Sequence, residues 1–262
     1  MPPAQRRSNS GVRATRQPSV DPDEVEKFSA ISEEWWEPSG KFAALHRFNP
    51  LRLGFIRQEA IAHFGRDDRS LQPFEGLALL DIGCGGGLLS EPMARLGFDV
   101  TGVDASQRNT NTAALHAKNA GLAIDYHSST AETLAEAGAA FDVVLNMEVV
   151  EHVANVDVFL GACATLVRPG GLIFVATINR TLKSLAFAKF GAEYVLGWVP
   201  QGTHDWNRFV PPRRLRAELA RHGLTIRKCQ GVGFDPLIWN WQLTRDMDIN
   251  YMVVASRPNS PR

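Results

Sequence analysis

The chain has 262 residues, of which 44% are hydrophobic and 21% are charged, a composition typical of globular domains. Its 28 Lys and Arg residues are balanced by 28 Asp and Glu residues, so no global field attracts nucleic acid and no such partner is expected. No uninterrupted apolar run of about 18 residues is present, so no membrane-spanning helix is expected. Three cysteines without metal-ligand spacing are typical of a reducing compartment.

The first 20 residues differ in composition from the rest of the chain. They contain four arginines and no acidic residue, together with Pro, Ser and Gln. Such a segment cannot bury a hydrophobic core, so residues 1–20 are predicted to be a disordered basic tail. A mitochondrial targeting segment is less favoured, because large apolar residues are too few for an amphipathic helix. One domain over residues 21–258 and a short tail over 259–262 are expected.

Two helices are expected before the first strand. Asp21 is placed to cap the first helix, with a proline in the first helical position and Glu24 where a capping box requires it. This helix is predicted to run through Trp35. The dipeptide Asn49-Pro50 repeats the signal of a cap followed by proline, so the second helix is predicted to begin there.

From the first strand onward, apolar strands alternate with helices. The expected strands are LALLDIG, FDVTGVD, LAIDYHS, FDVVLNM and LIFVATI, followed by two closing strands, TIRKCQGVGF and INYMVVASR. Continuous apolar strands separated by helices are typical of a parallel sheet covered on both faces. The expected fold is therefore one Rossmann-like α/β domain, with a mostly parallel seven-stranded sheet, helices on both faces and an N-terminal helical layer.

A glycine-rich turn follows the first strand. Gly83, Gly85 and Gly87 lie between a strand and a helix, where backbone without Cβ atoms can approach a ligand and helix N–H groups point toward it. About 20 residues later, Asp104 ends the second strand, where a carboxylate accepts hydrogen bonds from ribose hydroxyls. This order of elements indicates a nucleoside-containing ligand, and a tight turn that binds nothing is less favoured.

The ligand is either a dinucleotide or S-adenosylmethionine. The dinucleotide fingerprint requires a third glycine where this chain has Leu88. Asp81, just before the glycines, would repel a diphosphate but suits the cationic amino-acid group of the other ligand. S-adenosylmethionine is therefore favoured, and a nicotinamide-dependent oxidoreductase is the less favoured alternative.

Several stretches resemble known methyltransferases. DIGCGGGL, VTGVD, FDVVL and LVRPGGL resemble the motifs of class I methyltransferases, whereas the DPPY-type signature of enzymes that methylate nucleobase amino groups is missing. SEEWWEPSGKFAALHRFNPLRLGFI, MEVVEHV, TINRTLKS, GAEYVLGWVPQGTHDWNRF and DINYM resemble the ubiquinone-biosynthesis O-methyltransferases, from about Phe28 to Val254. Members of that family methylate a phenolic hydroxyl of polyprenylated catechol-type rings, at both O-methylation steps of the pathway.

The resemblance implies roles for several residues in holding the cofactor. Arg52 would hold its carboxylate, for which a planar guanidinium is a good bidentate partner. Gly83 would lie under the methionine portion, with Gly85 in the same turn. Asp104 would lie at the ribose and Met147 near the adenine. Without the resemblance, Arg52 would be interpreted as a solvated helix arginine.

The segment MEVVEHV follows the fourth strand and is predicted to open a helix at the carboxyl edge of the sheet, where ligands bind in open α/β folds. On a helix, Glu148, Glu151 and His152 would share an arc of about 100°. The resemblance implies that they hold a divalent metal, with Mg²⁺ expected, that favours the phenolate form of the substrate. The alternatives are catalysis by His152 as a general base, with Glu148 as a second catalytic candidate, or a helix cap beside a packed histidine.

Residues 182–209 are predicted to be a lid or a membrane-contact insertion. Within them, 182–198 mixes leucines and aromatic residues with lysines, which fits both interpretations. A polyprenyl substrate favours shallow contact with an anionic membrane. The expected location is therefore cytoplasmic, peripheral at the inner face of the inner membrane, or on the matrix side in a mitochondrion. Association with other ubiquinone-biosynthesis enzymes is a further expectation.

The sequence thus predicts an O-methyltransferase that uses S-adenosylmethionine and acts on a polyprenylated catechol or demethylubiquinol substrate. An O-methyltransferase for another small phenol is the first alternative, and the oxidoreductase is less favoured. A non-catalytic binding module is disfavoured because the cofactor motifs are intact.

Overall fold

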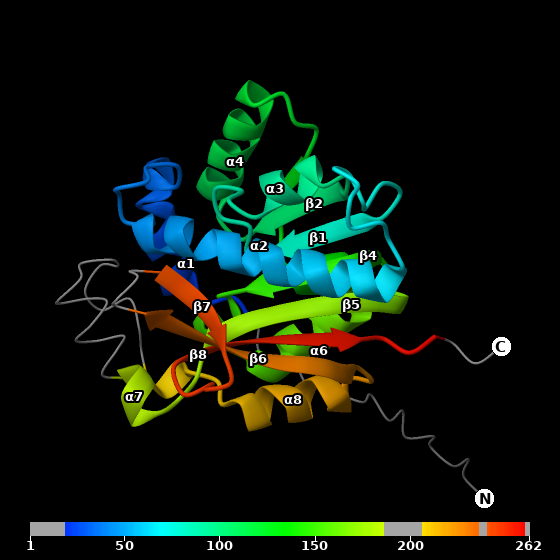
Figure 1. Ribbon diagram of the computed structural model, residues 1–262. Coiled ribbons are helices and arrows are strands. Elements are labelled where there is room, and N and C mark those ends of the chain that lie inside the picture. Colours follow the sequence, from blue (N-terminus) through cyan, green and yellow to red (C-terminus); the bar gives the residue numbers. More distant parts are fainter. Residues whose placement is uncertain (1–18, 186–205, 236–239, 260–262) are drawn as a thin grey trace, which may run out of the picture.

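An eight-stranded sheet forms the centre of the computed structural model, which describes residues 19–185, 206–235 and 240–259 (Figure 1). The strands lie in the order β3-β2-β1-β4-β5-β8-β6-β7. The first five pair in parallel, and β8, β6 and β7 extend the sheet by antiparallel pairing. The Rossmann-like fold with a mostly parallel sheet is confirmed. The strand bounds are β1 Ala78–Ile82, β2 Asp99–Asp104, β3 Asp125–Ser128, β4 Phe141–Met147, β5 Val167–Ile178, β6 Thr225–Asp235, β7 Asn240–Thr244 and β8 Asn250–Ser256.

The described sheet has one strand more than the seven expected. The additional strand is β7, which pairs with β6 at the edge of the sheet. None of its five residues is buried. An edge strand of this kind lacks the continuous apolar run by which buried strands are identified from sequence.

Helices cover both faces of the sheet. On one face α2 runs across the strands, and residues of α2 and α3 pack with the sheet in one core cluster (Figure 1). On the other face α5, α6 and α8 pack with the sheet in a second cluster. The helix bounds are α1 Pro22–Ser29, α2 Ala43–Phe64, α3 Ser90–Arg95, α4 Gln107–Asn119, α5 Ala131–Glu136, α6 Val156–Leu166, α7 Leu182–Leu185 and α8 Pro212–Arg221.

Helix α2 begins seven residues before the predicted start at Pro50, which lies inside the helix. The prediction was wrong because Asn49 does not act as a cap: its amide donates to the carbonyl of Leu88 at 2.8 Å, and its side-chain oxygen accepts from Arg52. Phe48 and Phe55 hold the helix against the sheet. This packing offsets the cost of about 3 kcal/mol that an interior proline imposes.

Helix α1 begins as predicted but ends earlier. The side chain of Asp21 caps it by accepting from the amide of Asp23 at 3.1 Å. The helix ends at Ser29 and is followed by a separate 3₁₀ helix, Ser32–Glu34, rather than running through Trp35. Glu24 does not complete a capping box, because its carboxylate reaches across to His152.

Parts of the predicted organisation lie outside the described residues. These parts are residues 1–18 of the tail, 260–262 at the C-terminus, and 186–205 within the lid or membrane-contact insertion. Within the part of the chain that is described, the helices are too short or too polar to cross a membrane.

Candidate functional site

The glycine turn between β1 and α3 has the backbone that its sequence requires. Gly83, Gly85 and Gly87 have φ angles of 66°, 53° and 88°, in the left-handed region that favours glycine. A Cβ on Gly85 would lie 2.4 Å from the ring of Trp35, so the indole fits against this turn because residue 85 has no side chain. Gly83 lines two cavities, whereas Gly85 lines neither. Gly85 therefore shapes the turn rather than the wall of a cavity.

The first cavity, called the Asp104 cavity, is built around the end of β2. Asp104 accepts hydrogen bonds from the amides of Gly85 at 3.0 Å and Ser106 at 2.8 Å, and from the side chain of Asn109 at 3.2 Å. Burial raises the pKa of its carboxyl group. Asn109 and residues 129–132 also line this cavity. The carboxylate of Asp104 is therefore an acceptor at the end of β2, where the sequence predicts one for ribose hydroxyls.

The second cavity, called the Arg52 cavity, contains Arg52, Asp81 and Met147. Arg52 is 2% exposed and donates to Asn49, and its guanidinium lies 4.9 Å from the ring centre of Phe48. Its Nε is buried and has no hydrogen-bond partner among the described residues. A buried guanidinium nitrogen without a hydrogen-bond partner costs free energy unless a ligand accepts a hydrogen bond from it. A carboxylate in this cavity would do so, which fits the predicted cofactor.

Asp81 lies in the same cavity and is 3% exposed. Its carboxylate accepts from the hydroxyl of Ser90 at 2.6 Å. Burial raises its pKa from 3.8 to about 6, while the Ser90 hydrogen bond and the charge of Arg52 act in the opposite direction. A cationic group in the cavity would favour the ionised carboxylate. Asp81 and Arg52 together therefore suit a ligand that carries both an ammonium and a carboxylate.

The structure places Met147 in the wall of one of the two cavities. It ends β4 and is 6% exposed in the Arg52 cavity, and it does not line the Asp104 cavity. That Met147 lies near the adenine stays a prediction; in the structure it shares the Arg52 cavity with Arg52 and Asp81.

The segment MEVVEHV does not open an α-helix. Glu148 has φ 61° and is the only described non-glycine residue with a positive φ. A short 3₁₀ helix follows, Val150–His152, and α6 begins only at Val156. The left-handed residue breaks the regular helical arc that was expected for these polar side chains. Such strained backbone costs about 1–3 kcal/mol and tends to occur at functional sites.

Glu148, Glu151 and His152 nevertheless all line the Arg52 cavity. Burial and the neighbouring charge of Glu151 raise the pKa of Glu148 to about 7, and burial also raises the pKa of Glu151. Glu151 accepts from the hydroxyl of Thr177 at 2.8 Å. Glu151 thus disfavours ionisation of Glu148, whereas the hydrogen bond with Glu148 favours ionised Glu151, and such a carboxyl pair is suited to sharing a proton or a cation.

The three predicted metal ligands do not converge. In the described residues, the ligand atoms of Glu148, Glu151 and His152 are not all within 4.8 Å of one another. The reason is that Nδ1 of His152 lies 2.7 Å from a carboxylate oxygen of Glu24. The two glutamates suit a hard cation, whereas His152 is already engaged by α1.

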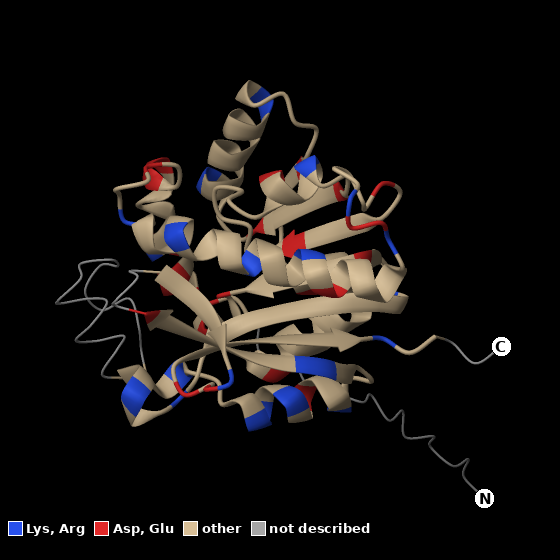
Figure 2. Ribbon diagram, in the orientation of Figure 1, with Lys and Arg blue, Asp and Glu red and all other residues tan. Residues whose placement is uncertain are grey.

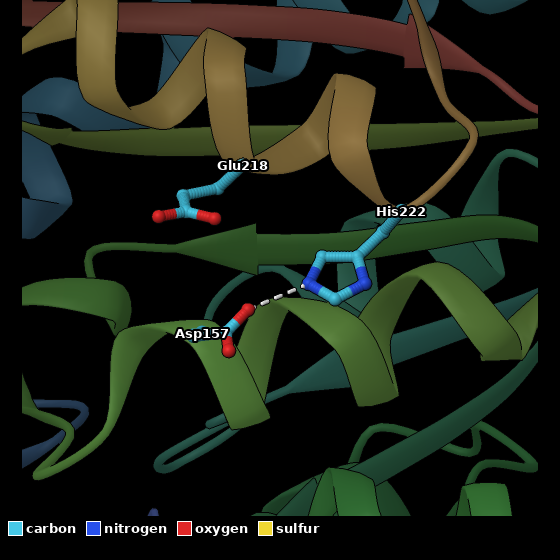
Figure 3. A group of neighbouring side chains, drawn as sticks. All are labelled: Asp157, Glu218 and His222. Atoms are coloured by element: carbon cyan, nitrogen blue, oxygen red, sulfur yellow. Dashed lines mark hydrogen bonds and ion pairs between the residues drawn. The ribbon is translucent and has the colours of Figure 1, made fainter.

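One surface cluster does meet that distance. Figure 3 shows Asp157 of α6 facing Glu218 and His222 of the α8 region, and their ligand atoms lie within 4.8 Å of one another. Arg221 already pairs with both carboxylates, at 2.6 Å from Glu218. The cluster therefore has its own cation, and it ties α8 to α6 rather than forming a metal centre.

Sequence reasoning missed the side chains that cover the cavities from the N-terminal segment. Glu24, Phe28 and Trp35 all line the Asp104 cavity, and Phe28 and Trp35 also line the Arg52 cavity. Trp35 donates to Asn109 at 3.0 Å and stacks on Phe42 with ring centres 3.7 Å apart. The paired tryptophans of the resembling segment were a signal, but nothing in their spacing assigns them to the cavities.

The sequence matches a family model and is similar to known proteins. A family model described as a methyltransferase domain matches residues 56–228. A ubiquinone biosynthesis O-methyltransferase from Caulobacter vibrioides is 59% identical over 240 residues, which cover 91% of this chain and 95% of the relative. One from Sinorhizobium medicae is 58% identical over 244 residues, which cover 93% of this chain and 98% of the relative.

Solved structures share the fold at low sequence identity. Magnesium protoporphyrin IX methyltransferase from Synechocystis, with bound SAH, aligns with a TM-score of 0.61 and 18% identity, covering 90% of this chain and 100% of that one. An S-adenosylmethionine-dependent methyltransferase from Clostridium acetobutylicum aligns with a TM-score of 0.59 and 13% identity, covering 89% and 99%.

Proposed function

The chain belongs to the family of ubiquinone biosynthesis O-methyltransferases, and we propose that it transfers a methyl group from S-adenosylmethionine to a phenolic hydroxyl of polyprenylated catechol-type intermediates. Both O-methylation steps of ubiquinone synthesis are included in the proposal. The acceptor class is a demethylubiquinol or its polyprenylated catechol precursor.

One observation carries the proposal beyond family membership. Two adjoining cavities share Gly83, Glu148 and His152 in their walls. One cavity offers Asp104 as an acceptor for ribose, and the other offers Asp81 and Arg52 for an amino acid. A ligand that carries both parts would span the shared wall, and the groups able to handle a phenolic proton lie at that junction.

The chemistry of the acceptor explains the polar groups at the junction. S-adenosylmethionine supplies an electrophilic methyl group, which an ionised phenol oxygen attacks far more readily than a neutral one. A phenol has a pKa of about 10, so the site must favour loss of its proton. His152 can accept that proton, and Arg52 and Asp81 orient the donor. The apolar side chains of Phe28 and Trp35 exclude water from the same space.

We infer that Glu148 and Glu151 hold a magnesium ion. Two neighbouring carboxylates fit a hard cation, which would relieve the repulsion that raises the pKa of Glu148. The imidazole of His152 is a poorer ligand for magnesium and is paired with Glu24. When bound, the ion would favour the ionised acceptor oxygen.

The magnesium site is tested by thermal unfolding with and without magnesium, after chelation. Addition of the ion should raise the Tm of the parent protein, because a ligand that binds only the native state stabilises it. The variants Glu148→Gln and Glu151→Gln should lose most of that rise. The surface variant Glu26→Gln is the control, and an equal rise in all four proteins would contradict the assignment.

A methyl-transfer assay tests the proposed function directly. The purified chain should methylate a short-chain prenyl catechol when S-adenosylmethionine is supplied, with and without magnesium. Binding of S-adenosylmethionine and of NAD is compared by calorimetry on the same preparation. Binding of NAD without binding of S-adenosylmethionine would refute the proposal and favour the oxidoreductase alternative.

We further propose peripheral contact with an anionic membrane, at the inner face of the inner membrane. Leu182 is 79% exposed at the start of the insertion, next to Lys183. Figure 2 shows basic residues along α7 and α8, and Arg213, Arg214 and Arg216 of α8 are exposed. Exposed apolar and basic side chains together favour a surface of acidic lipid. Association with other enzymes of the pathway would take place there.

The membrane proposal is tested by co-sedimentation with liposomes. The parent chain should bind vesicles that contain anionic lipid and bind vesicles of neutral lipid much less. Deletion of residues 182–198 should abolish the anionic binding. A deleted variant that binds as well as its parent, while still binding S-adenosylmethionine, would refute contact through this segment.

A further inference from the structure

Helix α1 supplies the contacts that fix the orientation of the His152 ring. A carboxylate oxygen of Glu24 lies 2.7 Å from Nδ1 of His152, although the two residues are 128 positions apart. The ring of Phe28 meets the His152 ring edge to face, with centres 5.1 Å apart and an interplanar angle of 83°. Both members of this hydrogen-bonded pair have side chains that are 19% exposed. The imidazole is therefore held from α1 on two sides.

The hydrogen bond between Nδ1 of His152 and Glu24 determines whether Nε2 is a donor or an acceptor. When Nδ1 carries the proton and donates to Glu24, Nε2 of the neutral ring is left as an acceptor. His152 lines both the Asp104 cavity and the Arg52 cavity, where donor and acceptor molecules would meet. A carboxylate behind an imidazole fixes the tautomer and the orientation of the ring.

We propose that Glu24 is a positioning residue for methyl transfer: its carboxylate, carried by α1, holds Nδ1 of His152 so that Nε2 takes the proton of the acceptor hydroxyl. The inference rests on the proposed function. As the O–H bond breaks, its proton passes to Nε2. The oxygen electron pair forms the bond to the methyl carbon, and the sulfur keeps the electrons of the broken C–S bond. The proton then leaves His152 for solvent.

The placement of Glu24 links this proton acceptor to closure of the cavities. Helix α1 is attached to the body by the carbonyl of Ser19, which accepts from the amide of Ala154 at 2.7 Å, and by an ion pair between Asp21 and Arg208 at 2.7 Å. The same helix places Phe28 in the walls of both cavities. The helix that orients His152 thus also forms part of the cover of the site.

Glu24→Ala removes the hydrogen bond, and Glu26→Ala is the matched control, because Glu26 is an exposed acid on the same helix. Each protein is assayed with a prenyl catechol and with its ring-nitrated analogue, whose phenol is already largely ionised at the assay pH. We expect kcat of Glu24→Ala with the catechol to fall by about tenfold or more. With the nitrated acceptor, kcat should stay within about twofold of the parent, since no base is needed.

Three results would overturn the inference. An equal loss with both acceptors would show that Glu24 acts only by packing α1. An unchanged kcat with the catechol would show that Glu24 does not orient the base. A rise in the KM for S-adenosylmethionine at unchanged kcat would assign Glu24 to cofactor binding. Should Glu24→Ala unfold, Glu24→Leu, which fills the space without an acceptor for Nδ1, takes its place, and a parent chain inactive on both acceptors would instead refute the proposed function.

Discussion

Replacement of Asp81 by Asn should have opposite effects on the stability of the fold and on the affinity for the cofactor. Asp81 is 3% exposed, and burial raises the pKa of its carboxyl group from 3.8 to about 6. Asn has nearly the same shape, and its side-chain oxygen can still accept from Ser90, which lies 2.6 Å away in the parent. The substitution therefore removes the buried negative charge and little else.

The sign and size of the effect follow from the two pKa values. A carboxyl group whose pKa is higher in the folded state contributes stability fully below pH 3.8, and this contribution is lost as the pH rises through about 6. The difference between 3.8 and about 6 corresponds to about 3 kcal/mol. Asp81→Asn should therefore be more stable than the parent by up to about 3 kcal/mol near pH 8, and the advantage should shrink toward pH 4.

Urea unfolding of both proteins without cofactor, at several pH values between about 4 and 8, measures this difference. Calorimetry measures the affinity for S-adenosylmethionine, which should be lower for the variant than for the parent. The reason is that the variant offers no negative charge to the ammonium group. A stability difference that is independent of pH would refute the reasoning about burial. Unchanged cofactor affinity would refute the role of Asp81 in binding.

Two further substitutions test the Arg52 cavity and the glycine turn beside it. Arg52→Lys keeps the charge but loses the planar guanidinium, so affinity for S-adenosylmethionine should fall by about tenfold or more in calorimetry, and an unchanged Kd would contradict the role. Gly85→Ala places a Cβ 2.4 Å from the ring of Trp35 at a φ of 53°, so urea unfolding should show a loss of about 1–3 kcal/mol. Adding Trp35→Ala should recover part of that loss, whereas strictly additive losses would contradict the clash.

The fold was predictable because its signals are local. Apolar runs separated by helices identify the central strands of a sheet that is buried on both faces. The errors occur where tertiary contacts override local preference. Asn49-Pro50 has the pattern of a helix start, yet Asn49 bonds to Leu88 and Arg52 inside a longer helix. The edge strand β7 escaped notice because none of its residues is buried.

The site was predictable only in part. Asp81, Gly83 and Asp104 lie where the strand–turn–helix pattern places them, because the carboxyl ends of parallel strands form one edge. The roles of these residues toward a cofactor stay predictions. The positive φ of Glu148 had no signal in the sequence. Nor does any local pattern bring Glu24 to His152, because that contact joins two distant parts of the chain.

Those distant contacts also prescribe an order of assembly. Glu24 meets His152 across 128 positions, Ser29 meets Ser106 across 77, and Trp35 meets Asn109 across 74. Contacts that close such long loops form late, after the central sheet has collapsed. During synthesis, α1 leaves the ribosome early, but its contact with His152 cannot form until β4 and the segment after it have emerged. The first helix of the described residues thus completes its contacts late, and an incomplete nascent chain has a cofactor edge without its cover.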